Sequence, residues 1–209
     1  MNNQHTTPPA QGLYDPRYEH DACGMGFVAH LKGVKSHRIV QNALTVLANL
    51  NHRGASGSEA STGDGAGIML QIPHHFLSRV CRATGIGLPP PGQYGVGVAF
   101  LSQDEAEADR CREAATAVIT TTGQACLGWR RVPTNSSDLG ATSLGSEPSV
   151  WQFFIGRSPA LTDPLAFERK LYIIRRRLEK EVGQSGAYGR FYLPSLSSRT
   201  LVYKGMLLA

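Results

Sequence analysis

The sequence predicts an α+β layered sandwich, and three observations favour that class. Of its 209 residues, 41% are hydrophobic and 18% are charged, which is typical of a globular domain with a real core. Runs with the two-residue period of strands and runs with the 3.6-residue period of helices both occur. They mix without the strict alternation, and without the phosphate-loop glycines, of a doubly wound fold.

Strands are predicted where apolar and aromatic residues lie between glycines, prolines and polar turns. Residues 23–30 (CGMGFVAH) alternate small and apolar side chains, and residues 68–72 (IMLQI) form an apolar run that ends at Pro73. Further strands are expected over residues 94–101, 124–132 and 150–156, with one or two more in the last twenty residues.

Helices are predicted where apolar residues recur every three or four positions. The segment 36–51 begins with Ser36 as a plausible N-cap and has its apolar stripe at Ile39, Ala43, Val46, Leu47 and Leu50. A shorter helix is expected over residues 74–84. The segment 51–67 is dense in Gly, Ser and Ala, and the segment 133–148 is rich in Pro, Ser and Gly, so we expect loops in both.

Two further helices have clear start signals. Ser102-Gln103-Asp104-Glu105 has the form of a capping box that opens a helix to about residue 122. Asp163 as N-cap and Pro164 at the first helical position begin another. Its apolar stripe is Phe167, Leu171, Ile174 and Leu178.

Several function classes are disfavoured. The formal charge is +5, which could suggest nucleic-acid binding. The one basic run, however, lies on a predicted helix beside glutamates, which favours a salt-bridged surface. The basic run comprises Arg175, Arg176, Arg177 and Lys180, and the glutamates are Glu168, Glu179 and Glu181. The four cysteines form no C-x-x-C pair and no two histidines are spaced i, i+4, so no metal or iron–sulfur cluster is expected in this segment. The glycines of residues 63–67 (GDGAG) precede a strand, which favours a tight turn over a phosphate site.

No apolar stretch approaches the roughly 18 residues that a membrane span needs. The N-terminus has neither the basic start nor the apolar run of a secretory signal. We therefore expect a cytoplasmic protein without a membrane segment.

Cys23 is the residue that suggests chemistry. It follows a polar leader, residues 1–22, which has no apolar periodicity. If the leader were removed, Cys23 would carry both a thiol and a free α-amine, and an amine pKa of about 7.7–8.0 suits a general base at neutral pH. Nucleophile and base would then belong to one residue. The alternative is a buried structural cysteine.

The sequence around Cys23 and elsewhere in the chain resembles the class II glutamine amidotransferase domain of glutamate synthases. The matching segments span nearly the whole chain: YDPRYEHDACGMGFVAHLKG around Cys23, NHRGA at 51–55, TGDGAGIMLQIPHHF at 62–76 and FYLPSLSSRTLVYKGML at 191–207. The resemblance implies an αββα sandwich of the N-terminal-nucleophile hydrolase type, with residues 1–22 as propeptide and residues 23–209 as a partial amidotransferase domain.

The resemblance also implies roles. The substrate would be glutamine, Cys23 would be the catalytic nucleophile, and Arg53 and Gly54 would shape the site. No cofactor is implied for this segment. The complete family enzymes use FMN and an iron–sulfur cluster in other domains and work with a small subunit, and they pass ammonia to 2-oxoglutarate. The sequence does not indicate the electron donor.

One departure from the family is expected to matter. Family sequences continue beyond the position of Ala209 with an arginine that holds the glutamine carboxylate and an Asn-Gly pair that forms the oxyanion hole. We therefore expect the fold to be incomplete at the C-terminus and the isolated chain to have little activity. The alternatives are a catalytically silent remnant and an amidotransferase domain that serves another acceptor.

Overall fold

The computed structural model describes residues 10–12, 15, 24–50, 65–186 and 188–205. In chain order its elements are α1 (His37–Asn49), β1 (Ala66–Gln71), α2 (His74–Arg82), β2 (Tyr94–Leu101), α3 (Glu105–Thr121), β3 (Ala125–Arg131), α4 (Ala141–Ser146), β4 (Ser149–Gly156), α5 (Pro164–Leu178), the π-helical turn η3 (Glu179–Gly183), β5 (Phe191–Ser197) and β6 (Thr200–Gly205).

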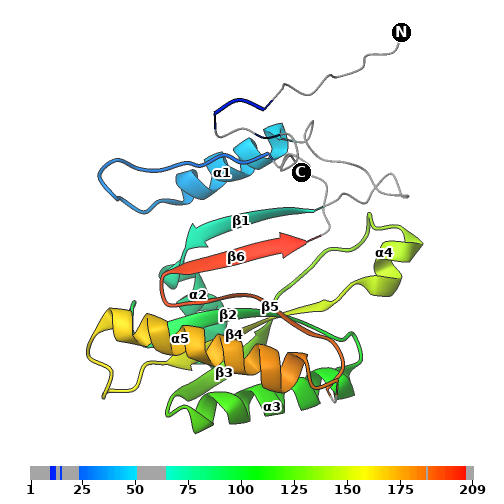
Figure 1. The fold of residues 1–209 in the computed structure, drawn as a ribbon. Coiled ribbons are helices and arrows are strands. Elements are labelled where there is room, and N and C mark those ends of the chain that lie inside the picture. The colour runs from blue at the N-terminus through cyan, green and yellow to red at the C-terminus, as the bar shows by residue number, and fades with distance from the viewer. Residues whose placement is uncertain (1–9, 13–14, 16–23, 51–64, 187, 206–209) are drawn as a thin grey trace.

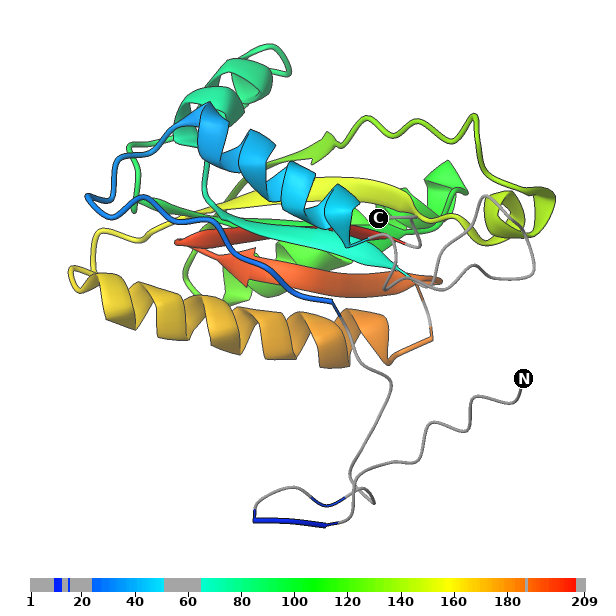
Figure 2. The same ribbon diagram turned by 90° about the horizontal axis from the view of Figure 1, so that it is seen from above.

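The elements stack in four layers, as Figures 1 and 2 show. A four-stranded antiparallel sheet, in the order β3-β4-β2-β5, has α3 and α5 on its outer face. On its other face lies a two-stranded antiparallel sheet of β1 and β6, and α1 packs outside that pair. The sequence of layers is helix, sheet, sheet, helix, so the predicted αββα sandwich is confirmed.

The four-stranded sheet is buried on both faces, which explains the continuous apolar run of β2. Ala99 and Leu101 belong to the core under α3 and α5, whereas Val96 and Val98 belong to a second core between the sheets. Successive residues of a strand point to opposite faces, so both faces need apolar side chains when both are covered.

Helix α5 begins and packs as the sequence predicts. The Asp163 carboxylate accepts from the backbone N–H groups of Leu165 at 3.0 Å and Ala166 at 2.9 Å. The predicted stripe is fully buried at Phe167, Leu171, Ile174 and Leu178. On its exposed side Arg175 pairs with Glu179 at 2.9 Å and Arg177 with Glu181 at 2.6 Å, which confirms a salt-bridged surface.

The strand predicted over residues 23–30 is wrong for the residues that the structure describes. Residues 24–30 have no regular secondary structure, and Met25 and Phe27 are exposed. A strand exists only where a neighbour completes its hydrogen bonds, and both strands of the nearby sheet pair with each other alone. The alternation of small and apolar residues does not report whether such a neighbour is present.

Three smaller expectations also change. The predicted loop 133–148 contains the short helix α4. Helix α3 is capped by Asp104, whose carboxylate accepts from the N–H of Glu107 at 2.8 Å, rather than by Ser102. The Asp-x-x-Glu spacing of Asp104 and Glu107 fits the same capping rule two residues further along the chain. Strand β1 begins at Ala66, and its residues alternate between half-buried and exposed.

Candidate functional site

The three residues proposed from the sequence for the site, Cys23, Arg53 and Gly54, lie outside the described residues. The structure does describe the residues that border them in the chain. Helix α1 ends, β1 begins and β6 ends at the same end of the two-stranded sheet in both views (Figures 1 and 2). In the register of that sheet, Ala66 lies opposite Gly205.

Two glycines allow close backbone approach at this end of the molecule. A Cβ on Gly26 would lie 2.4 Å from Cγ1 of Val46 on α1, so the segment that follows Cys23 passes directly over the helix. A Cβ on Gly67 would lie 2.9 Å from the backbone oxygen of Tyr203 on β6. The described part of the GDGAG segment therefore serves close packing against another backbone, which agrees with the structural interpretation of its glycines.

A buried polar chain joins the two sheets. Gln152 on β4 is fully buried; its Oε1 accepts from Arg130 Nη1 at 2.5 Å, and its Nε2 donates to the Tyr203 hydroxyl at 2.6 Å. Burial raises the pKa of Tyr203, so its hydroxyl stays protonated at neutral pH. The sequence analysis missed this chain, although a lone glutamine within the apolar segment VWQFFIG is a signal of a buried hydrogen-bond network.

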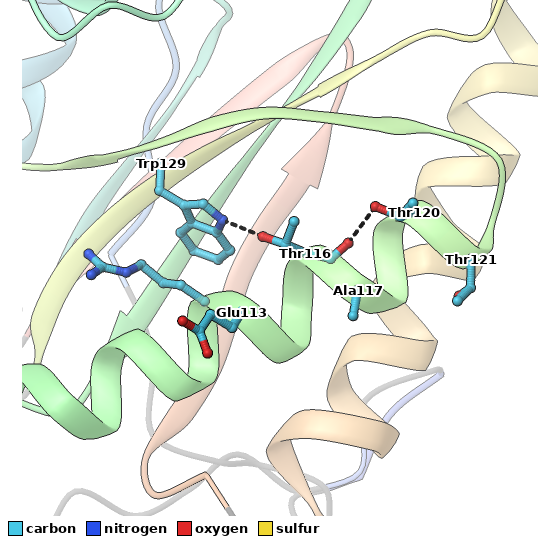
Figure 3. A pocket seen from close by; sticks show the side chains of 7 residues that line it. Glu113, Thr116, Ala117, Thr120, Thr121 and Trp129 are labelled. Carbon is cyan, nitrogen blue, oxygen red and sulfur yellow. Dashed lines mark hydrogen bonds between the residues drawn. The ribbon is translucent and has the colours of Figure 1, made fainter.

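Cavities among the described residues include an open groove and a smaller pocket. The larger, of about 680 Å³, is an open groove between α3 and β3 (Figure 3). Trp129 Nε1 donates to the Thr116 hydroxyl at 3.0 Å there, and the Thr120 hydroxyl donates to the Thr116 carbonyl at 2.9 Å. These polar groups already have partners, and the groove contains none of the residues proposed for catalysis.

The smaller cavity, of about 310 Å³, lies at the opposite end of the two-stranded sheet, where β1 ends and the β5–β6 turn begins. Lys35, His74 and Arg199 supply positive or titratable groups to its wall. Tyr94 is almost fully buried, and its hydroxyl lies 3.0 Å from Nδ1 of His74. Burial raises the pKa of Tyr94 to about 12, whereas burial, His75 and Lys35 lower the pKa of His74.

The three described cysteines are packing residues. Cys81 and Cys111 are fully buried, and Cys126 is half-buried. Burial raises the pKa of all three thiols, which keeps them protonated and weakens them as nucleophiles. They lie in three different elements, and no group of three His, Cys, Asp or Glu side chains in the described part of the chain could hold a metal ion.

Among the helices that the structure describes, none is both long and apolar enough to span a membrane.

Comparison with known proteins identifies relatives over most of the chain. It is 49% identical over 200 residues to the glutamate synthase [NADPH] large chain of Bacillus subtilis, a match that covers 96% of this chain and 13% of that protein. It is 42% identical over 210 residues to the glutamate synthase [NADH] of Schizosaccharomyces pombe, covering 96% of this chain and 10% of that protein. A ferredoxin-dependent glutamate synthase of Oryza sativa is 38% identical over 191 residues, which is 90% of this chain and 12% of that protein. The chain thus spans about a tenth of the length of these relatives.

The family described as glutamine amidotransferases class-II matches residues 23–209. That match agrees with the layered fold, which is of the N-terminal-nucleophile hydrolase type. The chain belongs to the class II glutamine amidotransferases.

Proposed function

We propose that this chain is the glutaminase part of a glutamate synthase, with Cys23 as its nucleophile. The Cys23 thiolate attacks the side-chain carboxamide carbon of glutamine, and the carbon–nitrogen bond breaks as ammonia leaves. The remaining glutamyl thioester reacts with water, which gives glutamate and returns the thiol. No oxidant or reductant takes part in this half of the reaction.

The observation that carries the proposal is the start of the family match at Cys23 itself. This start is what a mature domain beginning at Cys23, after removal of residues 1–22, would produce. The raised thiol pKa of Cys81, Cys111 and Cys126, the first two fully buried and the third half-buried, supports it independently, because it leaves Cys23 as the cysteine suited to nucleophilic attack.

Proton transfer in this proposal uses the α-amine of Cys23. An N-terminal amine with an ordinary pKa of about 7.7–8.0 can accept the thiol proton and later pass a proton to the departing ammonia. Arg53 and Gly54 shape the site around the nucleophile. Arg53 is a positioning residue, since a guanidinium stays charged at neutral pH and is suited to hydrogen bonding rather than to proton transfer.

The ammonia would aminate 2-oxoglutarate in glutamate biosynthesis. We extend this acceptor from the glutamate synthases that the chain resembles, and with it the other synthase domains, their FMN and iron–sulfur cluster, and a small subunit. The relatives are named for NADPH, NADH and ferredoxin, so similarity selects no electron donor for this chain.

The proposal is tested by placing residues 1–209 in the corresponding position of the Bacillus subtilis large chain and assaying the complete enzyme. We expect Cys23→Ala to abolish glutamine-dependent glutamate formation and to leave ammonia-dependent formation intact. Cys81→Ala, Cys111→Ala and Cys126→Ala are the matched controls, and each should keep glutamine hydrolysis within about threefold, because buried thiols act as small apolar groups. Intact-mass measurement should find the active protein starting at Cys23.

Two results would contradict the proposal. One is full glutamine-dependent activity in Cys23→Ala. The other is an active enzyme that retains residues 1–22 in every molecule, because a blocked amine could not serve as the base.

A further inference from the structure

The cavity of about 310 Å³ beside α2 is positively charged. It lies at one end of the two-stranded sheet, opposite to the end where β1 begins and β6 ends. Lys35 comes from the segment before α1, and Arg199 comes from the turn between β5 and β6. His74 is the first residue of α2, so the positive end of that helix dipole lies at the same cavity. Three elements distant in sequence thus bring like charges together.

Neither fixed cation is neutralised within the part of the chain that the structure describes. No carboxylate lines the cavity, and no ion pair involves Lys35 or Arg199 among those residues. The nearby Glu168 carboxylate is already used: it accepts from the hydroxyl of Ser197 at 2.5 Å, and from the hydroxyl of Ser198 at 2.5 Å and its N–H at 2.9 Å. The Asp163 carboxylate pairs with Arg169 at 3.5 Å and interacts with Arg199 only at longer range.

The wall of the cavity is held in place before any ligand binds. The N–H of Ile72 donates to the Arg199 carbonyl at 3.1 Å, and the N–H of Arg199 donates to the Ser197 hydroxyl at 3.0 Å. His74 lies 3.0 Å from the Tyr94 hydroxyl and 3.3 Å from the Ser78 hydroxyl through its two ring nitrogens. A preorganised wall lowers the entropic cost of binding.

We propose that this cavity binds a small molecule through a phosphate group, separately from glutamine hydrolysis. A guanidinium, an ammonium and a helix N-terminus are the groups that proteins use to hold phosphate oxygens. Pro73 at the N-cap position has no side-chain oxygen to cap α2, and the first N–H of the helix, that of His74, donates to the Ile72 carbonyl at 3.0 Å. The Gln71 amide adds a neutral donor to the same wall. The volume of about 310 Å³ lies within the range of small-molecule pockets, so the cavity has room for the group that carries the phosphate.

The test is isothermal titration of the full chain with sodium phosphate at low ionic strength, together with the NMR shifts of the His74 ring. We expect saturable binding that shifts His74 and weakens as sodium chloride is added, because salt screens the attraction. Lys35→Gln and Arg199→Gln should each weaken binding about tenfold, and the double variant should lose it. Succinate should bind at least tenfold more weakly than phosphate.

The matched control is Arg82→Gln with Lys180→Gln, which removes the same charge from the far end of α2 and from η3. It should bind phosphate within about twofold of the unchanged chain. Equal phosphate affinity in the Lys35→Gln/Arg199→Gln variant and this control would overturn the proposal, as would the absence of saturable binding by the unchanged chain. Succinate binding as tight as phosphate would overturn the assignment of a phosphate group. Thermal unfolding checks each fold, and Lys35→Gln alone, at an exposed position, keeps the test valid if Arg199→Gln unfolds.

Discussion

Helices α5 and α1 have similar apolar stripes in the sequence but very different burial in the structure. The four stripe residues of α5 are 0% exposed, whereas no residue of α1 is fully buried. Helix α5 shares the outer face of a four-stranded sheet with α3, while α1 lies on two strands. Two strands spaced about 4.8 Å apart are no wider than one helix, and in the described part of the chain β1 is the main element that α1 contacts. A stripe of apolar residues specifies which side faces inward, and the width of the partner decides how deeply it is buried.

We call the four-stranded sheet with α3 and α5 the thick half, and α1, β1 and β6 with residues 24–36 the thin half. The difference matters because the thin half contains the described residues next to Cys23, Arg53 and Gly54 in the chain. Leu50 ends α1, Gly65 precedes β1, and the segment after Cys23 packs on α1 at Gly26. The thin half also holds large exposed apolar side chains, with Met25 and Phe27 92% exposed and Met69 70% exposed. Low local contact density lowers the free energy of local opening. We therefore expect the half that borders the site to open more readily than the four-stranded half.

The largest loss of stability should come from truncating a large buried side chain in the thick half. Phe153 on β4 is fully buried and stacks on Trp129 with ring centroids 4.6 Å apart. Phe153→Ala should lower the free energy of unfolding by about 3–5 kcal/mol, because the cavity left behind cannot close. Val46→Ala on α1, where the side chain is only half-buried, should cost less than about 1.5 kcal/mol. Urea denaturation of both variants measures the two costs, and equal costs would remove the distinction between the halves.

An intermediate effect is expected where the halves are joined. Gln152→Leu removes the only link between the Arg130 guanidinium and the Tyr203 hydroxyl that the described residues show, and leaves both polar groups without that partner. We expect a loss of about 1–3 kcal/mol. Hydrogen exchange measured residue by residue should show β6 amides opening faster, with β3 and β4 nearly unchanged. Tyr203→Phe removes one side of the link and is the matched control, expected to cost about 1 kcal/mol. Uniform acceleration across all six strands would show that the link does not couple the halves.

Sequence patterns predicted the thick half closely because its signals are local. The run Tyr94–Leu101 is β2 to the residue, and Asp163 with Pro164 begins α5 as expected. The thin half was predicted less well, since pairing of residues 24–30 depends on a distant strand that no local pattern reports. The Arg130–Gln152–Tyr203 chain joins three strands and could not be assembled from spacing alone. The assignments of Cys23, Arg53 and Gly54 stay predictions, since they come from resemblance and lie outside the described residues.

The smallest effect expected concerns how the two helices begin. Backbone N–H groups of Leu165 and Ala166 lower the pKa of Asp163, with Arg169 and Arg199 adding to the shift, whereas Ser36 at the start of α1 makes no side-chain capping bond. A carboxyl whose pKa is lower in the folded state stabilises the fold above its unfolded pKa of about 3.9, and this contribution is lost as the pH falls through the folded value. Asp163→Asn keeps a capping oxygen but cannot ionise. The melting temperature of the unchanged chain should therefore exceed that of Asp163→Asn at pH 6, and the gap should close as the pH falls below 3. Ser36→Ala should change the melting temperature little at any pH. A gap for Asp163→Asn that stays constant with pH would mean that the Asp163 charge contributes nothing beyond its capping bonds.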